Sequence, residues 1–148
     1  MNQLRLSSLI ALITLVAVLP ACTSPKFAND WQAALQAPQD GIEGAWEGDW
    51  KSETSGHHGK LRCLVTKSPA DSHTYNFNYW ASWATVLSGG FQVTYDVQPS
   101  KDGYTVTGES DLGPFGLFHH QGHINDDHFH ADYRSKNDQG TFEMSRPH

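Results

Sequence analysis

Cysteine is scarce in this sequence: Cys22 and Cys63 are the only two among 148 residues. Cys22 is expected to carry acyl chains, as argued from the N-terminal sequence, so Cys63 has no disulfide partner. A fold held together by several disulfides is therefore excluded. Cys63 lies in an alternating run on the same face as Leu61 and Val65, so we interpret it as a buried apolar side chain rather than a reactive thiol.

Positive charge is also limited. The chain has 10 Lys and Arg against 16 Asp and Glu, a formal net charge of -6, and no basic cluster. Nucleic acid is therefore not an expected partner. Four catalytic signatures are missing as well: a nucleophile elbow, an H-E-x-x-H helix, a P-loop and a dinucleotide fingerprint. Whether the protein is an enzyme stays open, and the sequence leans against it.

Long apolar runs are missing except at the N-terminus, where Arg5 precedes a run over residues 6–19 that is short for a bilayer span. The run ends in Leu19-Pro20-Ala21-Cys22, which resembles the lipobox of bacterial lipoproteins. We therefore expect a signal peptide over residues 1–21 and acyl chains on Cys22. Two or more acyl chains anchor a protein stably to a membrane. The resemblance implies a location in the bacterial cell envelope, and Thr23 favours the outer membrane, facing the periplasm.

Residues 22–42 are expected to form a tether, over 23–26, and a short helix over 31–37. Asn29 or Asp30 would cap that helix, and Pro38 would stop it. From residue 43 to 148, period-two alternation replaces helical periodicity. It predicts eight strands, separated by short turns rich in Gly, Asn, Asp and Ser. The expected strands cover residues 44–52, 59–67, 74–83, 91–98, 104–109, 115–124, 128–134 and 140–146.

The fold class that follows is all-β. Eight strands joined by hairpin-length links form an antiparallel meander, and closing the meander into an up-and-down barrel removes its exposed edges. A sandwich is the alternative, but it needs a long crossing link. A two-residue turn at Asp126-Asp127 would pair His120 with Tyr133 inside the barrel and His123 with His130 outside.

Gly44-Ala45-Trp46 opens the first expected strand, and Arg146 closes the last. This pair resembles the G-x-W signature and the late arginine of lipocalins, within the calycin superfamily that also holds avidins and fatty-acid-binding proteins. The resemblance implies that Trp46 and Arg146 meet at one closed end of the barrel, which the preceding helix would also cover. The lipocalin motif between the sixth and seventh strands is absent, and the barrel is closer to avidin in size.

The inner face is rich in aromatic side chains, and a barrel of eight strands either fills with side chains or holds one small ligand. We expect a small, largely apolar ligand to contact Trp50, Tyr75, Phe77 and Tyr79. His57 and His58 would lie at the open end, with Asp111 and Asp138 as neighbours, and would contact a polar group of the ligand. A barrel filled by its own side chains, which would act through a surface partner, remains open.

Nine histidines suggest another class, a metal-binding envelope protein. Facing positions on adjacent strands place Cβ atoms about 5 Å apart, so His123 and His130 could chelate zinc or copper. His128 or Asp132 would complete the ligand shell. Because these positions lie on the wet outer face, no metal is expected to be required for folding or function, and opportunistic binding is the competing interpretation.

Overall fold

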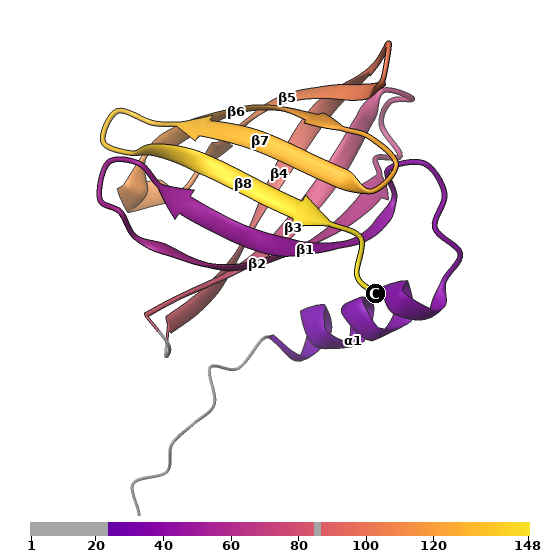
Figure 1. Ribbon diagram of the computed structural model, residues 1–148, viewed down its shortest axis with the longest axis horizontal. Helices are drawn as coiled ribbons and strands as arrows, with labels where there is room; N and C mark the ends of the chain where they lie inside the picture. Colours follow the sequence, from indigo (N-terminus) through magenta and orange to yellow (C-terminus); the bar gives the residue numbers. More distant parts are fainter. Residues whose placement is uncertain (1–23, 85–86) are drawn as a thin grey trace, which may run out of the picture.

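A computed structural model of the chain describes residues 24–84 and 87–148. It contains one helix followed by eight strands that close into an antiparallel barrel in sequence order, β8 pairing with β1 (Figure 1). The predicted all-β, up-and-down barrel is confirmed. The predicted signal peptide and Cys22 lie outside the described residues. The elements are α1 (Pro25–Gln36), β1 (Gly44–Ser52), β2 (His58–Lys67), β3 (Thr74–Trp83), β4 (Leu87–Ser100), β5 (Gly103–Asp111), the 3-10 turn η1 (Gly113–Phe115), β6 (Leu117–Ile124), β7 (His128–Arg134) and β8 (Gln139–Ser145).

Alternation along each strand divides inside from outside. In β4, Val93, Tyr95 and Val97 are buried in the core, whereas Thr94 and Asp96 between them are exposed. The predicted register of the last hairpins is confirmed, since His120 faces Tyr133. A two-residue turn fixes that register because it leaves one way to place both apolar sets inside.

The helix differs from the prediction at its start. It begins at Pro25 rather than near residue 31, and its cap is Ser24, whose hydroxyl accepts a hydrogen bond from the Phe27 N–H at 3.1 Å. Serine before a proline at the first helical position is a favourable start, because that proline has no N–H to leave unpaired. The predicted caps, Asn29 and Asp30, are therefore interior residues. Among the described residues, no helix has the length and apolarity that crossing a bilayer requires.

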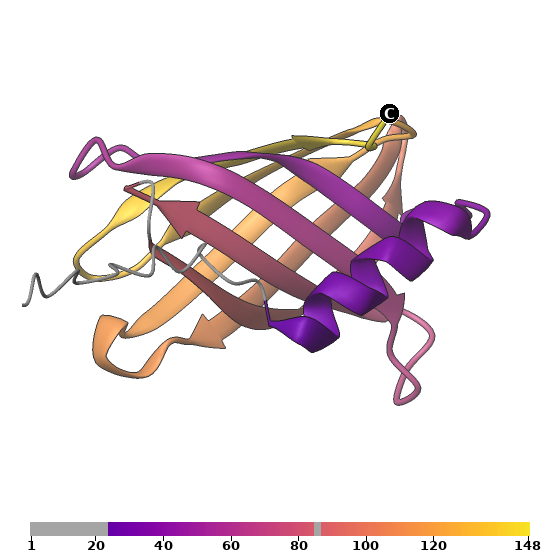
Figure 2. The same ribbon diagram turned by 90° about the horizontal axis from the view of Figure 1, so that it is seen from below.

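The helix also lies elsewhere than expected. Phe27 and Trp31 pack on Ala45 of β1 and Leu64 of β2, which point outward from the barrel. Trp80 of β3 extends this outer cluster. Figure 2 accordingly shows α1 crossing the outside of the barrel wall rather than covering one end. The helix lies here because this position buries its apolar side chains against the outward-facing apolar residues of β1 and β2.

Strand β4 is longer than predicted. Residues 88–90 (Ser-Gly-Gly), expected to form a turn, pair with residues 80–82 of β3. A Cβ atom at position 90 would lie 2.9 Å from the Trp80 ring, so glycine allows the strand to pass this indole closely. Gly90 therefore serves close approach within the sheet, and both glycines belong to a strand rather than to a reversal of the chain.

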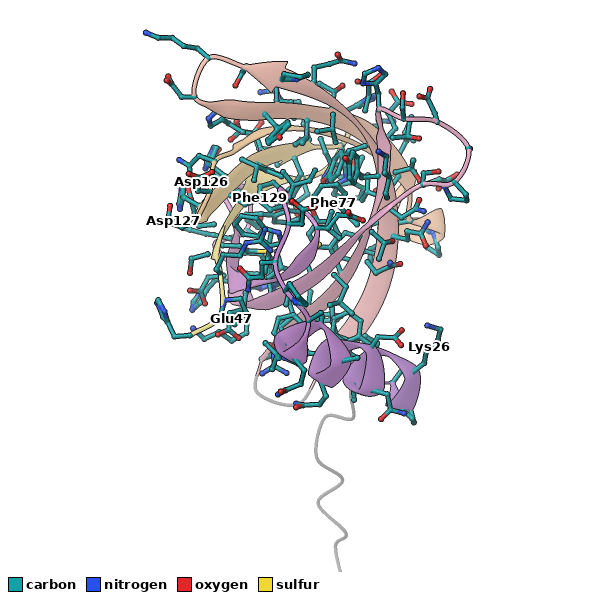
Figure 3. The ribbon with its side chains drawn as sticks, turned by 90° about the vertical axis from the view of Figure 1, so that its right-hand side faces the viewer. Lys26, Glu47, Phe77, Asp126, Asp127 and Phe129 are labelled. Atoms are coloured by element: carbon teal, nitrogen blue, oxygen red, sulfur yellow. The ribbon has the colours of Figure 1, made fainter. Side chains whose placement is uncertain are left out.

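One end of the barrel is closed by side chains. Trp46 is fully buried and donates its indole N–H to the Ile42 carbonyl at 2.9 Å. The Arg146 guanidinium lies 3.9 Å from the centre of the Trp46 ring, so the expected meeting of these residues is confirmed. Phe77 and Phe129 fill the space above them with ring centres 5.6 Å apart, as Figure 3 shows from this end.

Candidate ligand-binding site at the open end of the barrel

The opposite end holds a cavity of about 530 Å³. We call this space the mouth cavity. It is formed where β1, β3, β5 and β7 end and the other four strands begin. Its lining is largely apolar, with a few polar groups on one side. The lining residues are Trp50, His57, Leu61, Ala81, Trp83, Gly89, Gly90, Phe91, Leu112, Phe115, Phe118, His120, Tyr133, Asp138 and Phe142.

Trp50 is held in place by a hydrogen bond that spans three strands. Its indole N–H donates to the Ser82 carbonyl of β3 at 2.9 Å, although β2 lies between β1 and β3. The ring passes over Gly59 of β2, where a Cβ atom would lie 2.9 Å from the indole nitrogen and closer still to the Ser82 carbonyl oxygen. Glycine at position 59 therefore gives the indole its place on the wall of the cavity.

His120 is the most deeply placed polar residue of the lining. It is 4% exposed, and its Nε2 lies 3.0 Å from the Ser110 hydroxyl, while no partner is present for its buried Nδ1. Burial lowers the pKa of His120 to about 4, and the charge of neighbouring His119 contributes in the same direction. The imidazole is therefore neutral at physiological pH, and its enclosed Nδ1 has no hydrogen-bond partner.

A second polar group lies where β1 and β8 meet at the mouth. Ser52 is buried and donates to the Asp138 carboxylate at 2.6 Å, and the Tyr133 hydroxyl donates to the other oxygen of that carboxylate at 3.3 Å. Burial and the Asp138 charge raise the pKa of Tyr133. The tyrosine therefore stays protonated, and it presents a hydroxyl fixed by a carboxylate to the cavity.

The predicted ligand contacts separate into two groups. Trp50 and His57 line the mouth cavity, whereas His58 is exposed and turns its Nδ1 to the Gly56 carbonyl at 3.2 Å. The other three, Tyr75, Phe77 and Tyr79, pack in the core and are not part of its lining. Tyr79 has its own partner, because its hydroxyl lies 3.1 Å from that of Tyr95.

Of the acidic neighbours predicted for the mouth histidines, Asp138 lines the cavity. Asp111 instead accepts a hydrogen bond from the Gly113 N–H at 2.9 Å. This bond supports the turn that leads to η1, so its carboxylate has a structural partner.

The predicted metal ligands lie on the outer face. His123 and His130 face each other as expected, but the His123 Nε2 lies 3.3 Å from the Asp102 carbonyl. His128 and His130 both turn to Glu143, at 3.1 and 2.5 Å. Within residues 24–84 and 87–148, no three His, Cys, Asp or Glu side chains are grouped to hold a metal ion. Zinc or copper binding stays a prediction.

The same contacts explain why the pKa of His130 is raised. Partial burial lowers its pKa, but hydrogen bonds and attraction from Glu143 and Asp132 outweigh burial, so the pKa is raised overall. The acidic neighbours on the outer surface therefore favour the charged form of this imidazole, whereas burial disfavours the charged form of His120 inside.

Sequence reasoning missed several lining residues, above all the role of His120. Alternation places His120 inside the barrel, but no role was predicted for it, because the neighbouring histidines were interpreted as a metal site on the outer face. Leu112 was missed because it lies in an irregular connection, where no periodicity indicates which way a side chain points. Phe115 was expected to begin a strand over 115–124, but it belongs to the 3-10 turn η1, and β6 begins at Leu117.

Comparison of the chain with protein-family models, with curated proteins and with solved structures finds no match. The structure by itself shows a closed, eight-stranded antiparallel barrel with a short helix on its outer wall.

Proposed function

We propose that this protein binds one small, largely apolar molecule in the mouth cavity. The observation that carries the proposal is a cavity of about 530 Å³ in a barrel whose other half is filled by buried side chains. Sites for small molecules typically measure about 300–1,000 Å³, and they combine an apolar wall with a few polar groups. The mouth cavity has both properties.

The lining suggests what the ligand looks like. Trp50, Phe91 and Phe118 offer flat apolar surface for stacking and shape selection. His120 and Tyr133 offer hydrogen bonds without a positive charge, since His120 is neutral near pH 7. The expected ligand therefore has an apolar body and a single polar, uncharged hydrogen-bonding group.

The cellular setting follows from the N-terminal sequence. We infer a lipid anchor on Cys22 and a location in the bacterial cell envelope, outside the cytoplasm. Kinship with the calycin superfamily belongs to the same proposal: the meeting of Trp46 and Arg146 at the closed end supports it. Binding in the open end of a barrel agrees with that kinship.

A first test measures binding of the fluorescent apolar probe N-phenyl-1-naphthylamine to the purified chain. Ala81 lies in the cavity wall and is partly buried, so Ala81→Phe would fill space that a ligand needs. We expect this change to weaken probe binding about ten-fold or more, corresponding to about 1.4 kcal/mol. Trp50→Ala, which removes the stacking surface, should also weaken binding.

Leu35→Ala is the matched control, since Leu35 is an exposed apolar residue of α1 away from the cavity. Probe binding of that variant should equal that of the parent chain. If Ala81→Phe and Trp50→Ala both fold, judged by circular dichroism, and bind the probe as the parent does, the cavity is not the binding site. Native mass spectrometry of chain purified gently from bacterial envelopes would then identify any molecule carried elsewhere.

A further inference from the structure

Four large apolar side chains are exposed at the mouth of the barrel. Trp83 and Leu87 belong to the β3–β4 hairpin, and Phe115 and Leu117 belong to the connection from β5 to β6. We call these four residues the apolar rim. Phe115 is 72% exposed and Leu87 50% exposed; among the described residues, one other large apolar side chain, Leu35, is exposed. Exposed apolar residues gathered at one place mark an interaction surface.

The closed end has the opposite character. Its turns carry four exposed aspartates and a single lysine, Lys101, within residues 68–73, 101–102 and 125–127. Figure 3 shows Asp126 and Asp127 at the edge of this end. Acidic turns favour water and are repelled by anionic lipid headgroups. The mouth turns also carry Glu53, Lys136 and Asp138, so the apolar rim is the feature that suits that end for contact with a bilayer. The aspartates of the closed end are Asp71, Asp102, Asp126 and Asp127.

The start of the described chain lies toward the apolar rim. Helix α1 begins beside the middle of the barrel and runs toward the closed end, so its first residue is its nearest to the mouth, as Figures 1 and 2 both show. A groove on the outer wall joins Ser24 to Gly90 and Phe91, and these two residues also line the mouth cavity. A fully extended chain covers about 3.3–3.6 Å per residue, so a link of two residues between Ser24 and position 22 can span about 7 Å at most.

We propose that the apolar rim docks on the surface of a lipid bilayer, with the mouth cavity open toward the lipid. A short link to an acylated Cys22 would hold this end of the barrel at the membrane, and this part of the argument rests on the proposed lipid anchor. Phe115 and Leu87 enter the boundary between headgroups and acyl chains, and Trp83 lies at that boundary. An apolar ligand then passes between bilayer and cavity without crossing water.

The test places one dye at each end of the molecule. Phe115→Cys at the rim and Asp126→Cys at the closed end are each labelled with a nitrobenzoxadiazole dye in the full chain, purified from bacterial membranes. Cys63 is fully buried, so it is protected from the label, and parent chain treated with the same dye reports any background labelling. Each protein is reconstituted into phosphatidylcholine vesicles with and without spin-labelled lipid, which quenches a dye only at close range.

We expect the spin-labelled lipid to quench the dye at position 115 about two-fold or more, and to leave the dye at position 126 unchanged. Leu87→Cys should behave as Phe115→Cys does. Equal quenching at both ends, or none at position 115, would overturn the proposal. Protection of the dye at 115 in vesicle-free solution that grows with protein concentration would overturn it too, because a second copy would then cover the rim.

The binding assay with N-phenyl-1-naphthylamine in vesicle-free solution reports on the cavity separately. The rim proposal can therefore fail while ligand binding stands. Mass spectrometry of the N-terminal peptide from the same preparation reports on the acylation of Cys22.

Discussion

The two ends of the barrel are each marked by a tryptophan of strand β1. Trp46 and Trp50 lie four residues apart on the same inward face, and each donates its indole N–H to a backbone carbonyl at 2.9 Å. Trp46 is fully buried beneath the Arg146 guanidinium, whereas Trp50 is partly open and forms part of a cavity wall. The same residue type, in the same pattern, closes one end and leaves the other open.

The neighbours explain the difference. Around Trp46 the inward positions carry large side chains such as Phe77 and Phe129. Near Trp50, Phe142 faces it from β8, but the wall on the other side carries small inward residues: Gly59 on β2, Ala81 on β3 and Gly89 on β4. A small barrel is a cavity or a packed core according to the volume of its inward side chains. This chain is packed at one end and hollow at the other.

The largest expected effect breaks the closed end. Trp46→Ala removes a fully buried indole and should lower the free energy of unfolding by about 3–5 kcal/mol, because the packed surroundings cannot collapse into the space. Urea denaturation of the parent and of Trp46→Ala measures the loss. Trp50→Ala is the matched comparison and should lose about half as much, since part of its ring already faces the cavity. Equal losses would mean that both ends are packed alike.

A smaller effect is expected on the pH dependence of stability, through His120 at the open end. His120 protonates at about 4 in the folded barrel and at 6.5 when unperturbed. The unfolded chain therefore binds more protons between these values, and stability falls as the pH drops from about 6.5 to about 4. Between pH 8 and pH 5 this group should remove about 2 kcal/mol. His120→Phe should lose that part of the pH dependence in urea denaturation; an unchanged dependence would contradict a buried, neutral histidine.

The smallest expected effect concerns the rim. Phe115→Ser should change the free energy of unfolding by less than about 0.5 kcal/mol, because this side chain is 72% exposed and packs on little. Thermal unfolding followed by circular dichroism measures the change. A loss near that of Trp50→Ala would show that Phe115 supports the barrel, and its exposure would then not indicate a partner.

Much of the fold could be predicted because alternation and turn chemistry are local properties. The register of the β6–β7 hairpin follows from a two-residue turn and two apolar faces. The errors have local causes too. Residues 23–26, including Pro25, were interpreted as a tether, although the helix begins at Pro25. Gly89-Gly90 was interpreted as a turn, because a glycine pair occurs in turns as well as in strands that pass a large side chain. For the candidate site, alternation identified Trp50, but it could not show that Tyr75 and Phe77 lie below the cavity floor.

The sequence by itself determined which side chains point inward, because a strand turns every second residue to the same face. It also predicted an antiparallel meander, since the links are short, and it favoured a barrel over a sandwich; the pairing of β8 with β1 shows that the meander closes. Only the tertiary structure decided where the inside is full. That depends on which inward residues meet at one level of the barrel, as Gly59, Ala81 and Gly89 meet near Trp50. The height of each residue along the barrel axis depends on the shear, which is the shift in hydrogen-bond register between neighbouring strands. The shear is a property of all eight strands together.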